Sequence, residues 1–125
     1  MRFMMIVKAN KDSEAGVMPE EKMIAAMTRY NEELAKAGVL LGLDGLHPSA
    51  KGARVSFPGG KPRVTDGPFS ESKEIVGGYA IMEARSRDEA LALARRFMEL
   101  HLKHWPTFEG ECEMRPYQEG PPPTL

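Results

Sequence analysis

The sequence predicts an α+β domain of ferredoxin-like topology, and two kinds of pattern indicate it. Segments 2–9, 39–46, 75–84 and 108–117 have the apolar patterns of strands, whereas 19–37 and 87–103 have apolar residues spaced as in amphipathic helices. With a hairpin in the middle, the order is β-α-β, hairpin, β-α-β. In that split arrangement two helices cover one face of an antiparallel sheet.

The first half of the chain begins with a strand that is apolar on both alternating sets, which predicts a central position in the sheet. Pro19 suits the first turn of a helix that continues to Ala37, and Gly38 follows where a residue of positive φ commonly ends a helix. The apolar stripe of this helix has spacings of four, three and four: Met23, Met27, Tyr30 and Leu34. Residues 39–46 then form an irregular strand interrupted by two glycines.

The second half opens with a hairpin, in which 53–57 and 63–65 are joined by Pro58-Gly59-Gly60. After the strand 75–84, Ser86 and Glu89 have the spacing of a capping box, so the second helix begins near Arg87. The strand 108–117 has one polar face. We therefore expect a domain over residues 1–118 and a flexible proline-rich tail over 119–125.

Composition excludes several classes of function. Lys and Arg total 17 against 18 Asp and Glu, so no net field favours nucleic acid or acidic lipid as a partner. No apolar run approaches the roughly 20 residues of a membrane helix, and we expect no membrane association. Cys112 is the only cysteine, which excludes an internal disulfide and fits the reducing cytoplasm. No glycine-rich phosphate loop is present, so we expect no nucleotide cofactor and no other cofactor.

The strands that are apolar on both sides require a cover for the face that the helices leave open. The same face of another copy is the simplest cover, because a two-fold interface is self-complementary. The sequence therefore predicts a homodimer.

The segment Val64-Thr65-Asp66-Gly67-Pro68-Phe69 is followed by Glu71, Lys73-Glu74 and Gly77-Gly78-Tyr79. This pattern resembles the signature of the DGPF-domain proteins in the YCII-related superfamily, and the likeness extends through 38–41, 45–48 and 88–90. It implies a dimeric α/β barrel of ferredoxin-like subunits. In the wider superfamily a dehalogenase-like branch has a proposed His-Asp pair, and some members are associated with sigma factors. Residues 97–105 depart from the short helix ending of the sigma-linked type, which argues against that role here.

His47 and Asp66 are the candidate catalytic residues. Both fall at strand ends that bound the hairpin, where a histidine that titrates near neutrality and a carboxylate could form a proton-transfer dyad. The alternative, which the residue types favour on general grounds, is a surface histidine and an aspartate that accepts hydrogen bonds from the backbone of its own turn.

Three further residues are candidate ligand contacts. Because successive side chains of a strand point to opposite faces of the sheet, Tyr79 lies on the other face from Ala80, where its hydroxyl is available to a ligand or to Asp66. Phe69 and Glu71 belong to the signature segment and could line a pocket, although a packing role for the ring and a solvated role for the carboxylate are the more common arrangements.

His101 and His104 lie three residues apart on the second helix and could offer two metal ligands. No neighbouring cysteine or carboxylate completes a site, so we predict no metal and favour a structural or interface role. Cys112 falls on the apolar side of its strand, as a buried thiol does.

Two functions remain open. One is a small-molecule enzyme that transfers a proton with His47 and Asp66, its cavity lying between the helix-free sheet face and a partner copy. The other is a non-catalytic module that binds a small ligand or another protein, in which the signature turn is scaffold.

Overall fold

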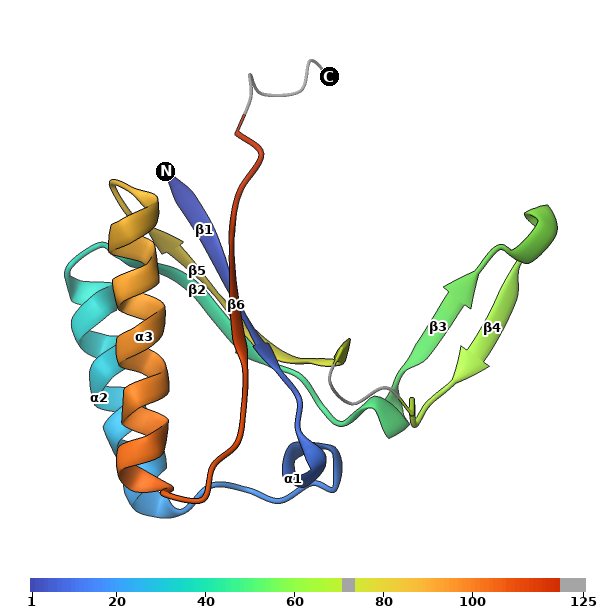
Figure 1. Ribbon diagram of the computed structural model, residues 1–125, viewed down its shortest axis with the longest axis horizontal. Coiled ribbons are helices and arrows are strands. Elements are labelled where there is room, and N and C mark those ends of the chain that lie inside the picture. The colour runs from blue at the N-terminus through green and yellow to red at the C-terminus, as the bar shows by residue number, and fades with distance from the viewer. Residues whose placement is uncertain (71–73, 120–125) are drawn as a thin grey trace.

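The structure is a computed structural model that describes residues 1–70 and 74–119. Its main sheet has four antiparallel strands in the order β2-β5-β1-β6. The strands are β1 (Arg2–Lys8), β2 (Leu40–Gly45), β5 (Val76–Glu83) and β6 (Cys112–Pro116). Two long helices, α2 (Glu21–Lys36) and α3 (Arg87–His104), lie on one face of this sheet (Figure 1). The predicted ferredoxin-like α+β fold is confirmed.

The ends of the long helices lie close to the predicted residues. The Ser86 hydroxyl oxygen accepts a hydrogen bond from the backbone N–H of Glu89 at 3.1 Å and so caps α3. Helix α2 begins two residues later than Pro19, because the N-cap residue Glu20 is still extended with ψ of 155°. Gly38 ends α2 with φ of 74°, the positive value predicted. Among the described residues, no helix is both long and apolar enough to cross a membrane.

Two local features differ from the prediction. A four-residue helix, α1 (Lys11–Glu14), follows β1 and was not predicted, because four residues are too few to show a helical period. Strand β6 begins at Cys112 instead of Phe108. The reason is a turn before it, in which the Phe108 N–H donates to the Trp105 carbonyl at 2.9 Å.

The core lies between the sheet and the two long helices. Met82 on β5, Met5 on β1 and Ala80 on β5 are at most 3% exposed. Tyr30 of α2 and Phe97 of α3 pack in the same cluster. Three residues of the apolar stripe predicted for α2 pack in this core, because Tyr30 belongs to the cluster and Met27 and Leu34 are partly buried against it. The fourth, Met23, is buried outside this cluster.

The opposite face of the sheet carries a second apolar set. The register pairs Met4 with Ile81 and Ile6 with Tyr79, and these four side chains are partly exposed. Figure 1 shows that neither long helix covers this face. The alternation predicted for β1 and β5 is therefore present, with one set under the helices and the other open.

The predicted hairpin is present as β3 (Ala53–Ser56) and β4 (Arg63–Asp66), which pair with each other in a separate two-stranded sheet. Every residue of these two strands is exposed. In Figure 1 the hairpin projects from the body on the side opposite the helices. We call residues 51–66 the hairpin arm.

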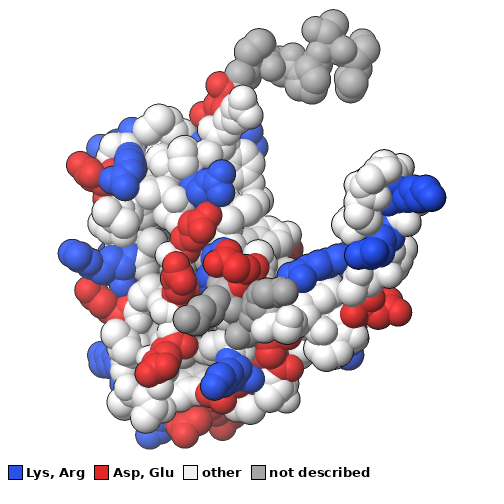
Figure 2. All heavy atoms as spheres, turned by 45° about the vertical axis from the view of Figure 1, so that its right-hand side comes forward, with Lys and Arg blue, Asp and Glu red and all other residues white. Residues whose placement is uncertain are grey.

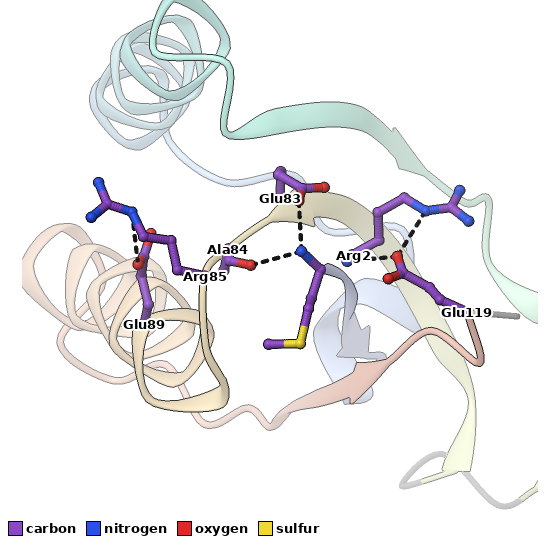
Figure 3. Close-up of polar contacts among 7 residues, drawn as sticks. Arg2, Glu83, Ala84, Arg85, Glu89 and Glu119 are labelled. Carbon is purple, nitrogen blue, oxygen red and sulfur yellow. Dashed lines mark hydrogen bonds and ion pairs between the residues drawn. The ribbon is translucent and has the colours of Figure 1, made fainter.

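The two ends of the described chain meet at one end of the sheet (Figure 3). The amino group of Met1 lies 2.6 Å from a carboxylate oxygen of Glu83 and 3.0 Å from the Ala84 carbonyl oxygen. The Arg2 Nε lies 3.2 Å from a carboxylate oxygen of Glu119. Of the predicted proline-rich tail, residues 120–125 lie outside the described residues.

The core predicts a large effect of truncating Met82. We expect Met82→Ala to lower the free energy of unfolding by about 2–5 kcal/mol, because a fully buried side chain leaves a cavity. Urea denaturation followed by far-UV circular dichroism measures this. Leu91→Ala is the matched control, since Leu91 is 47% exposed on α3 and should change stability by less than about 1 kcal/mol. Equal losses in the two variants would contradict this placement of the core.

Candidate functional site

A cavity of about 600 Å³ lies where β1, β2 and α3 end, and we call it the strand-end cavity. It contains two imidazoles, those of His47 and His101. Among the described residues that line it, Lys8 alone carries a permanent charge, and its ammonium lies 3.7 Å from carboxylate oxygens of both Glu74 and Glu113. Much of the remaining wall is apolar, with Val7, Val17, Met23, Trp105 and Phe108 among the lining residues. The cavity therefore favours an uncharged, mainly apolar occupant.

The short helix α1 and the turns around it close one side of this cavity. The Asn10 Oδ1 caps α1 by accepting from the Ser13 N–H at 2.8 Å. The Asn10 Nδ2 donates to the Glu109 carbonyl oxygen at 3.0 Å. One side chain thus ties α1 to the segment that precedes β6, which fixes two parts of the wall relative to each other.

His101 sits at the end of α3 in a cluster of aromatic rings. Its ring centroid lies 4.5 Å from that of Phe97 and 5.0 Å from that of Phe108. Its Nδ1 is 2.9 Å from the Phe97 carbonyl oxygen. A carbonyl can only accept, so Nδ1 of the neutral ring carries the proton and Nε2 keeps a free lone pair.

The protonation state of His101 follows from the same surroundings. Burial lowers the pKa of His101 below its ordinary value, and the hydrogen bond to the Phe97 carbonyl opposes this only in part. The ring is therefore predominantly neutral near pH 7. Its Nε2 is able to accept a proton there.

His47 lies between two cavities. The Leu46 N–H donates to the Gly77 carbonyl at 2.9 Å, which extends the pairing of β2 with β5 up to the residue before His47. The exposed imidazole lines the strand-end cavity and also a second cavity of about 460 Å³ at the base of the hairpin arm. Arg54 and Phe69 line that second cavity as well.

The signature segment is held by a polar junction beneath the arm. Ser49 is 6% exposed, and its N–H and hydroxyl both donate to the Glu14 carboxylate at the end of α1. The Ser49 oxygen also accepts from the Phe69 N–H at 3.0 Å. The Ser49 N–H, the Ser49 hydroxyl and the Phe69 N–H thus each have a hydrogen-bond partner, as buried polar groups require. We call Glu14, Ser49, Gly67 and Phe69 the signature junction.

Gly67 is the residue of this junction that tolerates no side chain. A Cβ at this position would lie 1.7 Å from the Ser49 carbonyl oxygen. The Gly67 N–H donates to the Gly52 carbonyl at 2.9 Å, and the Gly67–Pro68 peptide is cis. The backbone of the signature segment therefore packs directly on the backbone of the loop after β2.

Asp66, the predicted partner of His47, lies at the end of β4. It pairs with Ala53 at the base of the arm, is exposed, and lines neither of the two cavities that His47 lines. Among the described residues its carboxylate forms no hydrogen bond or ion pair, either with His47 or with the backbone of its own turn. The His47–Asp66 pairing stays a prediction.

Phe69 and Tyr79, two of the three predicted ligand contacts, lie in different parts of the molecule. The Phe69 ring lies beneath the Arg54 guanidinium, whose carbon is 3.9 Å from the ring centroid, in the second cavity with His47. Tyr79 lies on the helix-free face, where its hydroxyl is 3.2 Å from an Asp44 carboxylate oxygen. The charge of Asp44 and this hydrogen bond raise the pKa of Tyr79. Glu71 lies outside the described residues.

His101 is the residue that sequence reasoning undervalued. Its position on the stripe through Phe97 was apparent, but the cavity beside it depends on α1 and on the turn at Phe108. His104 does not line this cavity and instead borders a groove between α2 and α3. In the described part of the chain, no group of three or more His, Cys, Asp or Glu side chains could hold a metal ion. Burial raises the pKa of Cys112 to about 11, so its thiol is protonated near neutrality.

The chain is similar to a known protein family and to a protein of Rhizobium meliloti. The family model of the YCII-related domain matches residues 1–99, from the first strand to within α3. Uncharacterized protein R00369 of Rhizobium meliloti (strain 1021) is 30% identical over 108 residues, which cover 84% of this chain and 83% of that protein. The family match includes His47 and the signature junction, and it ends before His101 and the aromatic residues around it.

The signature junction predicts that Gly67→Ala is strongly destabilising. We expect a loss of at least about 2 kcal/mol in the free energy of unfolding, because the added methyl group overlaps the Ser49 backbone. Thermal and urea denaturation measure the loss. Gly45→Ala is the control, since a Cβ at Gly45 meets no heavy atom within 4 Å. A Gly67 variant as stable as the Gly45 variant would contradict the junction.

The surroundings of His101 predict a pH dependence of stability. The unfolded chain protonates this histidine near its ordinary pKa of about 6.5, whereas the folded chain does so only at lower pH. The free energy of unfolding should therefore fall as pH is lowered from 7.5 to 5.5, and His101→Gln should reduce that fall.

Denaturation curves at the two pH values test this, with His104→Gln as the control on the same helix. The prediction is wrong if His101→Gln and the wild-type chain lose the same stability between pH 7.5 and 5.5.

Proposed function

Because the chain belongs to the YCII-related family, we propose that it is a small-molecule protein whose strand-end cavity binds a compact organic compound and moves a proton on it through an imidazole. One observation carries this proposal: His101 directs Nδ1 to the Phe97 carbonyl and lies in the wall of a mainly apolar cavity. A neutral imidazole with a free Nε2 is suited to take a proton from a bound molecule.

The chemistry proposed is general acid–base catalysis. Nε2 of His101 accepts a proton from the substrate, and the Phe97 carbonyl keeps the opposite side of the ring in place while it becomes positively charged. A proton-transferring side chain typically contributes about 10²–10⁴ to the rate. His47, at the rim of the same cavity, is positioned to return a proton to another atom of the substrate.

The proposed substrate is uncharged and mainly apolar. A volume of about 600 Å³ falls in the range of cavities that hold small organic ligands. The carboxylates of Glu74 and Glu113 near the Lys8 ammonium weaken its attraction for an anion. No cofactor is part of the proposal.

The pairing of His47 with Asp66 is the second proton-transfer arrangement that we propose. It would use the cavity at the base of the arm, where His47 lies near Phe69 and Arg54. The Asp66 carboxylate, free of other partners among the described residues, would have to turn toward His47 when a ligand binds. We rank the His47–Asp66 arrangement below the one that uses His101, because the Phe97 carbonyl already orients the ring of His101.

A non-catalytic ligand-binding module is the alternative function, and the mainly apolar wall of the strand-end cavity suits it equally. We further propose that the protein is a homodimer, because Met4, Ile6 and Ile81 form an apolar strip on a sheet face that no helix covers. We place it in the cytoplasm, where a chain with a single cysteine needs no disulfide.

Nuclear magnetic resonance of the imidazole rings tests the proposed site. Nitrogen-15 shifts should assign the proton of His101 to Nδ1 near pH 7. In a screen of small uncharged carbonyl compounds, compounds that bind should shift the ring signals of His101 and His47. Met23→Trp fills the cavity and should abolish those shifts, whereas Leu91→Trp, on an exposed position, should not.

Turnover distinguishes the enzyme from the binding module. For a compound that the protein converts, His101→Gln should lower kcat by about 10²-fold or more while binding persists. Binding without turnover of any compound supports the module. A proton on Nε2 of His101, or ring shifts confined to other histidines, contradicts the proposed role of this residue.

A further inference from the structure

The hairpin arm has apolar side chains that its own chain leaves uncovered. Val55 and Val64 lie opposite each other in the register and are 63% and 66% exposed, and Phe57 beside the tip is 67% exposed. A two-stranded hairpin alone is marginally stable in water and normally packs against another element. The arm therefore presents a surface that requires a partner.

The direction of the arm is set at its base. The Gly67 N–H donates to the Gly52 carbonyl and so closes the base of the hairpin, and the Phe69 N–H donates to the Ser49 oxygen, which is itself bonded to Glu14 of the body. Figure 1 shows the arm leaving the body on the side of the open sheet face, and Figure 2 shows the space hollowed between arm and body. An occupant of this space would touch the arm and the open face together.

The charge of the arm identifies the occupant. Residues 51–66 contain four of the 17 Lys and Arg but one of the 18 Asp and Glu, so the arm carries +3 and the rest of the chain −4. In Figure 2 blue side chains line the arm, while red side chains gather on the neighbouring part of the body. The body of this chain is therefore complementary in charge to the arm, although its own arm stands away from it.

We propose that the arm of each subunit clasps the body of a second copy of this chain, with Val55, Phe57 and Val64 against the partner. This inference rests on the homodimer proposed above and adds the element that holds it. At about 3.3 Å per residue, the extended residues 53–57 span about 16 Å, whereas packed sheets lie about 10 Å apart. An arm of this length reaches past the partner's sheet, and two-fold symmetry uses both arms in the same way.

Sedimentation equilibrium of the full chain tests the clasp. The wild-type chain should be a dimer, and Val55→Ser combined with Phe57→Ser should raise its dimer dissociation constant at least tenfold. Leu91→Ser combined with Leu102→Ser is the control, because these α3 side chains are similarly exposed at 47% and 52%. The control should dimerise like the wild type.

A charge-reversal variant gives a second readout that does not depend on apolar side chains. Lys61→Glu combined with Arg63→Glu should weaken the dimer at low salt, and the difference from wild type should shrink at high salt. Far-UV circular dichroism verifies that each variant is folded.

Three outcomes overturn the clasp. A monomeric wild-type chain overturns both the clasp and the homodimer. Dimers of unchanged affinity in both arm variants overturn the clasp alone and leave the homodimer standing. Unchanged dimers, together with salt-sensitive binding of DNA that Lys61→Glu/Arg63→Glu abolishes, would assign the arm to nucleic acid instead.

Discussion

The direct contact of the Gly67 backbone with the Ser49 backbone is the constraint on which both proposed functional surfaces depend. Only glycine fits there, and the Glu14 carboxylate closes the contact by accepting from both donors of Ser49. The contact joins α1, the loop after β2 and the base of the hairpin arm. The first forms part of the strand-end cavity, the second carries His47, and the third sets where the arm points.

The two faces of the sheet have different surroundings, because helices cover one face and leave the other open. Burial under α2 and α3 stabilises the subunit and also brings the end of α3 beside the ends of β1 and β2. There Phe97 and Phe108 partly bury His101, which lowers the pKa of its ring and leaves Nε2 as an acceptor near pH 7. The opposite face and the arm remain apolar and open. The chemistry proposed for one side and the association proposed for the other both rest on one asymmetric covering of the sheet.

Most of the fold was predictable because it depends on periodicity and on local capping. The stripe of α2, the Ser86 cap and the alternation along β1 and β5 specify which faces are buried. What the sequence could not show was set by contacts between distant segments. The position of α1 is set by the Asn10 bond to the distant Glu109, and β6 starts late because Phe108 turns back toward Trp105 and His101.

The sequence by itself determined the fold class, the helix boundaries within a few residues, the hairpin and the residue types able to transfer protons. The tertiary structure decided which of those residues share a cavity. It placed His47 and His101 in the wall of one cavity, placed Asp66 in the arm and paired Tyr79 with Asp44. The physical reason is the separation along the chain over which each signal acts. Periodicity and caps depend on residues within a turn or a strand pair, whereas a cavity is made by distant side chains that only packing brings together.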